Sequence, residues 1–407
     1  MEKLSRVEEN FQLEIMKLFL HSFIVLFLLL FLTSCGDRQV EVKVTNKTGK
    51  EVGVKLIELP APKIFERLES KAFYITNVND EEIPSQLTHD SLILFAVDIP
   101  VDETQIFKVH PSDSLHYYPP TVWGQLYPRR RDDLSYENEL VGFRIYGPGT
   151  QKAGEKAFGY DIFFKHPTEK LVVPILYDLQ TDEANWKKAD SLRKIDNALA
   201  EEFINSFTYH IDHGNGMDCY AVGPTLGAGV TAILQNDSII YPWCYDSAEI
   251  LDNGPLRFTV KLQFPTSFEG NLSGLTENRI ISLDSYSFLN YCRVWFEGTD
   301  NPLTLVTGFP LRDDSKPVVE IEKGLLAYSD PTQGESNGKA LLGVRIKEHV
   351  DSVIVKDNHI LLVSNLNPSD IFEYKWGFSW DKTEIPNMDE WKIYLKNTNL
   401  NYTVEIK

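Results

Sequence analysis

Apolar and polar residues alternate in short segments along most of the chain. Val40, Val42 and Val44 are separated by polar residues, and the alternation returns over 52–59 after a turn at 46–49. Successive side chains of a strand point to opposite faces of a sheet, so this pattern is typical of half-buried strands, and the two segments predict a hairpin. Further strands are predicted at 91–97, 171–179, 256–264, 278–283, 291–296, 303–306, 340–346, 359–363, 373–380 and 402–406.

One segment has the spacing of a helix. Over 186–203, apolar residues recur at steps of three and four with charged residues between them: Ala189, Leu192, Ile195, Leu199 and Phe203. This period places them on one helix face. Asp182 precedes the segment and could cap it, with Glu183 in or near the first turn.

A long series of strands with one main helix favours an all-β fold, a large antiparallel β-sandwich. We find no internal repeat and no linker rich in Gly, Ser or Pro. The first expectation is therefore a single domain over 35–407. The alternative is a small N-terminal sandwich over 40–111 followed by a main domain over 112–407.

The N-terminal segment differs from the rest of the chain. An apolar run over 18–32 follows Lys17 and leads into Ser34 and Cys35. The run falls short of the ~20 apolar residues of a spanning helix, and small residues at its end are typical of a cleaved signal, so we expect a signal peptide over 1–34. Signal peptides begin with basic residues, whereas 1–14 holds four glutamates, so Met16 would be the conventional start.

The ending Leu32-Thr33-Ser34-Cys35 resembles the lipobox of bacterial lipoproteins, in which the cysteine is acylated and becomes the mature N-terminus. It predicts lipidation at Cys35, with a free cysteine after an ordinary signal as the alternative. No strong acidic run follows at 36–38, which favours an outer-membrane lipoprotein on the periplasmic face.

The net charge limits the partners. The chain carries a formal charge of −19, with 12% aromatic residues. Enough apolar material is present for a large core, which excludes disorder as the general state. Nucleic acid and anionic membrane surfaces repel negative charge, so we expect contact with the membrane only through the lipid. Neutral sugars are neither favoured nor excluded.

Three cysteines follow Cys35, at 219, 244 and 292. Cys219 and Cys244 lie on neighbouring strand-like segments and are the best candidates for a disulfide in an oxidising compartment. Buried free thiols are the interpretation that we favour. The cysteines and histidines have no zinc-site spacing.

Polar residues concentrate first at 128–138, which leads into a strand-like segment at 142–149. Alternation places Arg144 and Tyr146 on one face of this strand. An arginine and a tyrosine together can hold a carboxylate or a sugar hydroxyl. The structural interpretation is that Arg144 pairs with Asp132, Asp133 or Glu137.

A second concentration lies at 209–220, around a glycine-containing loop. Histidine exchanges protons near neutral pH, and a neighbouring carboxylate can fix its tautomer, which makes His210 and His213 candidate bases. The alternative is a turn capped by its aspartates. His210, Asp212 and His213 could join Asp218 around a divalent metal, and no other cofactor is expected. A third turn, 252–256, leads to Arg257 at the start of a strand.

These motifs together resemble a family of bacterial exported proteins that carries a domain of unknown function (DUF4861). The resemblance rests on Arg131-Asp132-Asp133, Glu137-Asn138 and Phe143-Arg144-Ile145-Tyr146-Gly147-Pro148, on Tyr209-His210, Gly214-x-Gly216-Met217-Asp218-x-Tyr220, Val222-Gly223 and Leu226-Gly227-x-Gly229, and on Asn253-Gly254-Pro255-Leu256-Arg257. It covers nearly the whole mature chain. Tyr136 stands where the family usually has Trp, and Glu139 where Asp is expected. Asn215 replaces an acidic residue, which weakens a metal role there.

The resemblance implies a large β-sandwich similar to galactose mutarotase-like domains, in a system that degrades uronate-containing polysaccharides. The leading hypothesis is a lyase or dehydratase on such oligosaccharides. Removing the proton beside a carboxylate needs a neutraliser, a base and an acid for the leaving oxygen. The candidates for these three roles are Arg144 or Arg257, His210 or His213, and Tyr146 or Tyr220. Further substrate contacts are expected from Arg131, Asp133, Glu137, Asn138, Asp212 and Asp218.

Two other functions use the same observations. One is a non-catalytic glycan-binding lipoprotein, and the other is a sugar epimerase or mutarotase. Catalysis is favoured if His210 and His213 share one pocket with Arg144 and Arg257. Binding is favoured if these side chains are scattered over the surface.

Overall fold

The computed structural model describes residues 38–407 apart from 169, 266–271, 314 and 348. The expected signal peptide, Met16 and Cys35 lie outside the described residues. Within the described ranges, no helix has the length and apolar character needed to cross a membrane.

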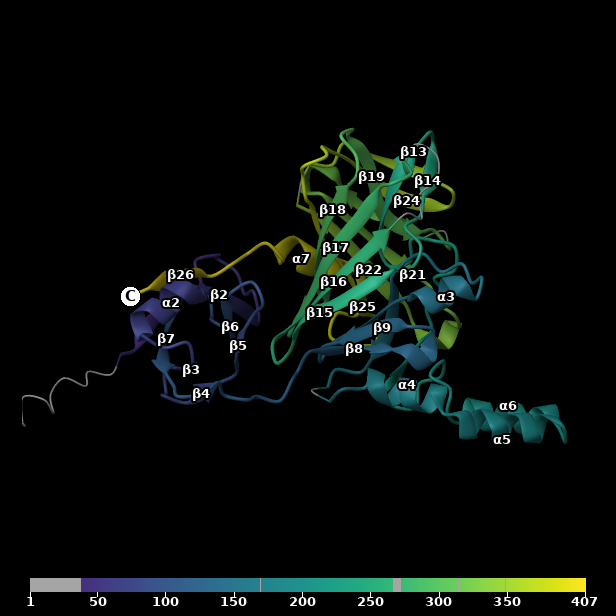
Figure 1. The fold of residues 1–407 in the computed structure, drawn as a ribbon, viewed down its shortest axis with the longest axis horizontal. Helices are drawn as coiled ribbons and strands as arrows, with labels where there is room; N and C mark the ends of the chain where they lie inside the picture. Colours follow the sequence, from purple (N-terminus) through teal and green to yellow (C-terminus); the bar gives the residue numbers. More distant parts are fainter. Residues whose placement is uncertain (1–37, 169, 266–271, 314, 348) are drawn as a thin grey trace, which may run out of the picture.

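A small β-sandwich forms the N-terminal part of the molecule (Figure 1). Its first sheet has the spatial order β26 (Thr403–Ile406), β1 (Val40–Thr45), β7 (Thr104–Pro111), β3 (Phe73–Thr76) and β4 (Glu82–Ile83). Its second sheet consists of β2 (Lys55–Pro60), β6 (Leu92–Val97) and β5 (Ser85–Leu87). Helix α2 (Ala61–Leu68) buries Ile64 and Leu68 in the same core.

The hairpin predicted at the start of this sandwich is wrong. Strand β1 pairs with β7 and β26, whereas β2 pairs with β6. The apolar residues of the two segments, such as Val42 and Ile57, do meet, but in the core between the two sheets. The alternation therefore reports which face is buried and leaves the pairing partner undetermined.

The C-terminal strand completes the N-terminal sheet. Strand β26 pairs with β1, so residues that the sequence placed with the main domain close the edge of the small one. Tyr402, just before β26, lies in the small core. Its hydroxyl accepts a hydrogen bond from the Ile99 amide (3.1 Å) and donates to the Gly53 carbonyl (2.9 Å).

The larger part of the molecule contains three sheets around a separate core. The largest sheet has the order β15 (Ser247–Asn253), β16 (Arg257–Pro265), β17 (Thr276–Asp284), β18 (Leu289–Glu297), β25 (Phe372–Trp380), β22 (Ala340–Ile346), β21 (Leu325–Asp330) and β20 (Val318–Glu320). A second has β14 (Ser238–Ile240), β13 (Thr231–Gln235), β19 (Leu303–Pro310), β24 (His359–Leu366) and β23 (Ser352–Lys356). The third has β12 (Gly216–Met217), β11 (Asp161–Lys165), β10 (Gly142–Ile145), β9 (Asp133–Glu137) and β8 (Trp123–Tyr127).

Apolar side chains from all three sheets of the larger part meet in one hydrophobic core. Every pairing between the described strands is antiparallel. The prediction of an all-β, antiparallel sandwich-type fold is therefore confirmed.

The helices differ from the prediction in two places. The segment expected as a strand at 171–179 contains α4 (Val173–Thr181), because the Glu137 carboxylate accepts the amides of Val172 and Val173 and fixes a helix start there. The single helix expected at 186–203 is two helices, α5 (Glu183–Arg193) and α6 (Asn197–Asn205).

Side-chain caps explain the ends of these two helices. The Asp196 carboxylate accepts the Ala198 amide and starts α6, which interrupts the expected helix. Asp182 caps α5 as predicted, accepting the Ala184 amide at 2.8 Å. The pair α5 and α6 projects from the body (Figure 1). The remaining helical segments are α3 (Pro148–Lys152), α7 (Met388–Asn397), η1 (Pro128–Arg130), η3 (Ile321–Lys323) and η4 (Glu335–Asn337).

The described cysteines are buried free thiols, so no disulfide joins Cys219 to Cys244. Burial raises the pKa of both thiols to about 12 and that of Cys292 to about 11. Thiolates are therefore disfavoured at all three positions.

Candidate functional site

Arg144 lies at the centre of a buried hydrogen-bond network. From β10 it donates to the Asp161 carboxylate (Nε–Oδ2, 2.8 Å) and to the Asp218 carboxylate (Nη2–Oδ2, 2.8 Å). It also donates to the hydroxyls of Tyr209 (3.1 Å) and Tyr146 (3.2 Å), and the Tyr146 hydroxyl donates to Asp161 at 2.7 Å. The structure thus brings together three residues singled out in the sequence, Arg144, Tyr146 and Asp218.

The positive charge of Arg144 is balanced within this network by carboxylates. Burial alone would lower the pKa of Arg144, but Asp161 and Asp218 outweigh it and raise that pKa well above its ordinary value. Burial raises the pKa of Asp161 to about 6, against the opposing effect of Arg144. The guanidinium already has two carboxylate partners, so it is poorly suited to neutralise a substrate carboxylate.

His210 and His213 lie at the surface beside this network, in a hydrogen-bonded turn. His210 is 55% exposed, and its Nδ1 is 2.8 Å from the Asp218 carbonyl oxygen. His213 makes a similar contact to the Thr208 carbonyl (3.2 Å). Asp212 accepts from the Gly214 and Gly216 amides and contacts His166 Nε2 at 2.9 Å. Asp212 therefore caps the turn, as the capped-turn interpretation expects, whereas the Asp218 carboxylate pairs with Arg144.

Gly216 explains why this turn needs glycine. Its φ is +117°, and a Cβ at this position would lie 2.0 Å from the Phe164 carbonyl oxygen of β11. The backbone of the turn can approach the strand only without a side chain. The glycine therefore serves the pairing of β12 with β11.

The residues of the first polar concentration also have structural partners. Glu137 contacts the buried Lys165 ammonium (2.5 Å) and holds the start of α4. Asn138 donates to the carbonyls of Asp284 and Ser287, both at 2.7 Å. Asp133 accepts from the Tyr177 hydroxyl (3.3 Å).

Arg131 and Tyr220 lie elsewhere. Arg131 forms an exposed ion pair with Glu155. Tyr220 is buried beneath the Arg312 guanidinium, which lies 4.9 Å from its ring centre. In the described part of the chain, no group of three or more His, Cys, Asp or Glu side chains could hold a metal ion.

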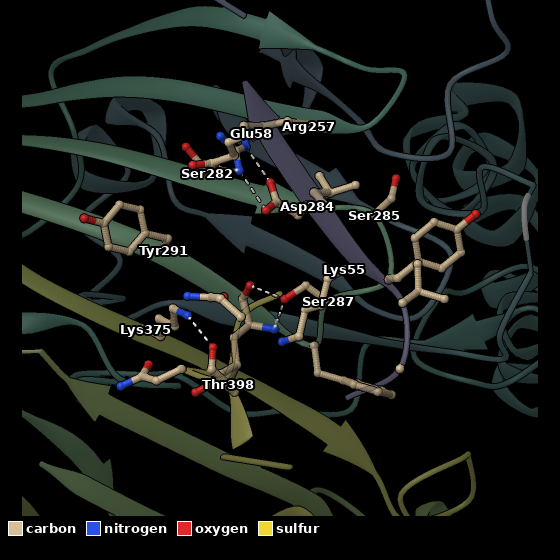
Figure 2. Close-up of a pocket in the computed structure, with 18 of the residues that line it drawn as sticks. Lys55, Glu58, Arg257, Ser282, Asp284, Ser285, Ser287, Tyr291, Lys375 and Thr398 are labelled. Atoms are coloured by element: carbon tan, nitrogen blue, oxygen red, sulfur yellow. Dashed lines mark hydrogen bonds and ion pairs between the residues drawn. The ribbon is translucent and has the colours of Figure 1, made fainter. Parts of the chain in front are cut away.

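Arg257 lies apart from Arg144, in a cleft between the two parts of the molecule (Figure 2). The cleft has a volume of about 1330 Å³. One wall is β2 with residues 399–402, and the other is the outer face of the largest sheet. Of the six residues expected to share a catalytic pocket, Arg257 is the one that lines this cleft. The structure does not bring Arg144, His210 and Arg257 into one hollow.

A row of polar side chains crosses the sheet wall of the cleft. The cross-strand partners at this level are Thr259 of β16, Ser282 of β17, Tyr291 of β18, Lys375 of β25 and Arg345 of β22. Because residues opposite one another in a sheet point to the same face, these side chains form a continuous strip along the cleft. The row presents hydroxyl groups at one end and cations at the other.

Three cations meet at the cationic end of the row, Lys55 from β2 together with Lys375 and Arg345. Lys375 Nζ donates to the Thr398 carbonyl at 3.1 Å, and Arg345 Nη1 donates to the Leu395 carbonyl at 2.9 Å. Among the described residues, none of these three cations has a carboxylate within ion-pair distance. We call this group the cation cluster.

The cations of the cluster repel one another. Burial, together with Lys55 and Arg345, lowers the pKa of Lys375 to about 8, against the opposing effects of Asp284 and Glu58. Burial also lowers the pKa of Lys55 and of Arg345. A bound anion would relieve this repulsion.

The charge balance of the cleft is unlike that of the chain. Six Lys or Arg residues and five Asp or Glu residues line it, whereas the whole chain has 40 of the former and 59 of the latter. An acidic protein therefore concentrates positive charge in this cleft.

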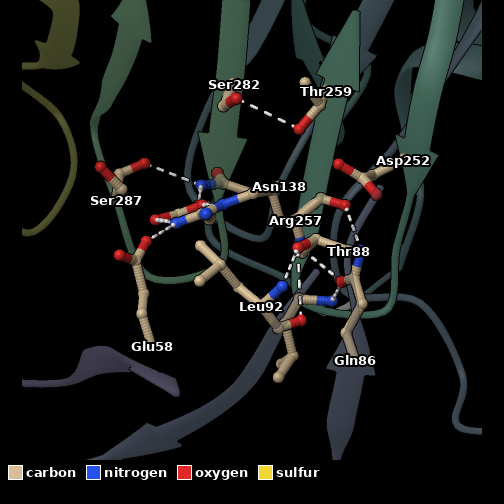
Figure 3. A network of polar contacts seen from close by, with 12 residues as sticks. Glu58, Gln86, Thr88, Leu92, Asn138, Asp252, Arg257, Thr259, Ser282 and Ser287 are labelled. Carbon is tan, nitrogen blue, oxygen red and sulfur yellow. Dashed lines mark hydrogen bonds and ion pairs between the residues drawn. The ribbon is translucent and has the colours of Figure 1, made fainter. Parts of the chain in front are cut away.

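Hydrogen bonds and ion pairs join the two parts of the molecule (Figure 3). The Gln86 side chain accepts the amides of Leu256 and Arg257, both at 2.7 Å, and donates to the Arg257 carbonyl. The Arg257 guanidinium contacts Asp284 Oδ1 (2.5 Å) and Glu58 Oε1 (2.8 Å). Arg257 is thus paired with two carboxylates, and it links the two parts of the molecule.

Sequence reasoning missed the cation cluster. The alternation over 373–380 predicts a strand, and it places Lys375 on the face opposite Tyr374 and Trp376. Nothing in the sequence says that Arg345 is its cross-strand neighbour or that β2 covers both. A lysine between Tyr374 and Trp376 was the available signal.

The chain belongs to the family described as "Domain of unknown function (DUF4861)". The family model matches residues 44–407. The "Uncharacterized protein P7" of Formosa agariphila is 26% identical over 326 residues, which cover 77% of each chain.

Two solved structures from Enterococcus faecalis are similar at low identity. A protein in glycosyl hydrolase family 38 has 8% identity and a TM-score of 0.48, over 92% of this chain and 48% of the other. An alpha-mannosidase has 9% identity and a TM-score of 0.46, over 91% and 46%. The chain spans about half the length of these two proteins. Likenesses of this size carry no argument about activity.

Proposed function

We propose that the cleft binds an acidic, uronate-containing oligosaccharide and that the protein acts on it as a lyase or dehydratase. The observation that supports this most directly is the cation cluster of Lys55, Arg345 and Lys375, which lacks carboxylate partners in the described part of the protein. A uronate carboxylate supplies the missing negative charge.

The rest of the cleft suits a sugar ring. The Thr259, Ser282 and Tyr291 hydroxyls follow the cluster in register along the wall. Hydroxyls and aromatic rings are the groups that proteins use to contact sugar hydroxyls and ring faces. A ligand bound along the row would place its carboxylate at the cationic end and its neutral rings at the hydroxyl end.

The reaction class follows from the same charges. Removing the proton beside a carboxylate creates negative charge on that carboxylate, and fixed cations lower the barrier because they stabilise this charge more strongly as it develops. Arg345 and Lys55 are the proposed neutralisers. Arg144, with its two carboxylate partners, does not enter this proposal.

A non-catalytic glycan-binding protein is the second candidate. It is favoured by the positions of His210 and His213, which lie in the turn outside the cleft. Both candidates require the acidic ligand, and they differ in whether it is consumed.

The test pairs each uronate oligosaccharide with its carboxyl-reduced analogue. Binding is measured by calorimetry, and turnover by mass spectrometry and by the ultraviolet absorbance of a new double bond conjugated to the carboxylate. We expect the acid to bind at least roughly tenfold more tightly than its neutral analogue. Equal affinities across a broad panel would contradict the proposal. Binding without any product would leave the second candidate.

We also propose that the protein is exported and anchored in the outer membrane through Cys35. The apolar run that ends in Leu32-Thr33-Ser34-Cys35 supports this. Labelling cells with a fatty acid analogue should mark the wild type and leave Cys35→Ser unmarked. Label that persists in the variant would contradict the proposal.

A further inference from the structure

We propose that Lys375 is the proton acceptor of the cleft and takes the proton beside the uronate carboxylate. This inference rests on the proposed function and adds a catalytic residue that the sequence motifs do not include.

The position of Lys375 supports this role. It lies in register between Tyr291 of β18 and Arg345 of β22, within the row that lines the cleft. A carboxylate held by Arg345 would bring the neighbouring carbon of the same sugar next to the adjacent side chain of the row. Figure 2 shows Lys375 beside Thr398, whose carbonyl accepts one of its hydrogens at 3.1 Å.

The surroundings of Lys375 favour its neutral form. Burial in the cleft lowers its pKa to about 8, and the cations Lys55 and Arg345 act in the same direction. Asp284 and Glu58 oppose this, but both accept hydrogen bonds from Arg257. The Tyr291 hydroxyl donates a hydrogen bond to the Glu373 carboxylate. A lysine with a pKa near the working pH provides a free lone pair for proton transfer.

The proposed step balances without a further reactant. The neutral Lys375 amine takes the proton from the carbon beside the carboxylate, so the C–H bond breaks and its electron pair forms a carbon–carbon double bond. The bond from the next carbon to its oxygen breaks, and that oxygen leaves with the electron pair. The new Lys375 ammonium returns the proton to this oxygen. The leaving group is a sugar hydroxyl in a lyase and water in a dehydratase.

The first experiment compares Lys375→Met and Lys375→Arg with Lys261→Met. Lys261 is an exposed lysine of β16 that does not line the cleft. Arginine keeps the charge but does not release its proton, so both Lys375 variants should lose turnover by at least about a hundredfold. Their affinity for the oligosaccharide should change by less than roughly tenfold. The wild-type rate should rise with pH as Lys375 loses its proton.

Turnover retained in Lys375→Arg would overturn the inference. So would a wild-type pH profile that is flat between pH 6 and 9, roughly two units below and one above the pKa of about 8. If the wild type neither binds nor converts any acidic oligosaccharide, the proposed function itself fails, and the lysine inference with it.

A second measurement does not depend on activity. Competitive acetylation of the whole protein at several pH values gives the ionisation of each lysine from its reactivity. Lys375 should become reactive at a pH well below the ordinary lysine pKa of 10.5. An ordinary titration of Lys375 in a protein that still binds the acid would overturn the inference and leave the proposed function standing.

Discussion

The Arg144 network is buried and the cation cluster is half-buried, and the charges of the two groups are arranged in opposite ways. Arg144 has two carboxylates and two tyrosine hydroxyls around it, and its charge is satisfied within the protein. Lys375 and Arg345 donate only to backbone carbonyls in the contacts described above. Removing one partner of a buried, paired charge destabilises a fold. Clustered charges of one sign lower stability unless a ligand of opposite charge neutralises them.

Removing the arginine from the network should have the largest effect. Arg144→Met leaves Asp161 and Asp218 buried beside one another without a cation. We expect a loss of about 3–5 kcal/mol in the free energy of unfolding, measured with urea. The matched control is Arg131→Met, which removes an exposed pair with Glu155 and should cost less than about 1 kcal/mol. Equal effects would show that the buried network stabilises the fold no more than an exposed ion pair does.

Replacing a cation of the cluster should raise the free energy of unfolding, whereas replacing Arg144 lowers it. The pKa of Lys375 is lowered from 10.5 to about 8, so holding it protonated in the fold costs roughly 3 kcal/mol below pH 8. Lys375→Met should therefore stabilise the protein at pH 7 by about 2–3 kcal/mol in urea unfolding.

The sign of this effect can be checked against pH. Between pH 8 and 10.5 the unfolded chain binds more protons at Lys375 than the folded protein does, so the wild type gains stability as the pH rises. The advantage of Lys375→Met should shrink over this range. A variant that is less stable than the wild type at pH 7 would show that the cluster is not strained.

The cluster should also determine affinity for the acid. Arg345→Gln or Lys55→Gln should each weaken binding of a uronate oligosaccharide roughly tenfold, and the difference from the wild type should fall in high salt. Isothermal calorimetry at low and at high salt measures the affinity and its salt dependence. Lys261→Gln is the control and should bind as the wild type does. If all three variants bind equally, the acid lies elsewhere.

The smallest effect is expected at the surface turn. His210→Gln removes an imidazole that is 55% exposed and lies outside the cleft. We expect the free energy of unfolding to change by less than about 1 kcal/mol, and affinity and turnover to stay at the wild-type values. A folded variant that binds the acid but no longer converts it would return His210 to the mechanism.

Local patterns were sufficient where the determinant lies within a few residues. Asp182 caps a helix because its carboxylate reaches an amide two residues away. The segment 40–44 shows this most clearly, with its valines buried and Glu41 and Lys43 on the other face. Such features need no knowledge of distant segments.

Features that depend on distant partners could not be predicted in the same way. Arg257 and Lys375 are both cations on strands of one sheet, yet Arg257 meets Asp284 and Glu58, while Lys375 meets no carboxylate partner in the described residues. The difference arises from strand register and from the position of β2 over the sheet. Neither is encoded in the period of a single strand.

The place of β26 beside β1 has a consequence for the order in which the molecule is made. Residues 40–45 and 403–406 are neighbours in one sheet, so the small sandwich gains this edge strand only after the whole larger part has left the ribosome. Until then, β1 has an open edge on that side. The unit whose synthesis begins first is therefore among the last to be completed.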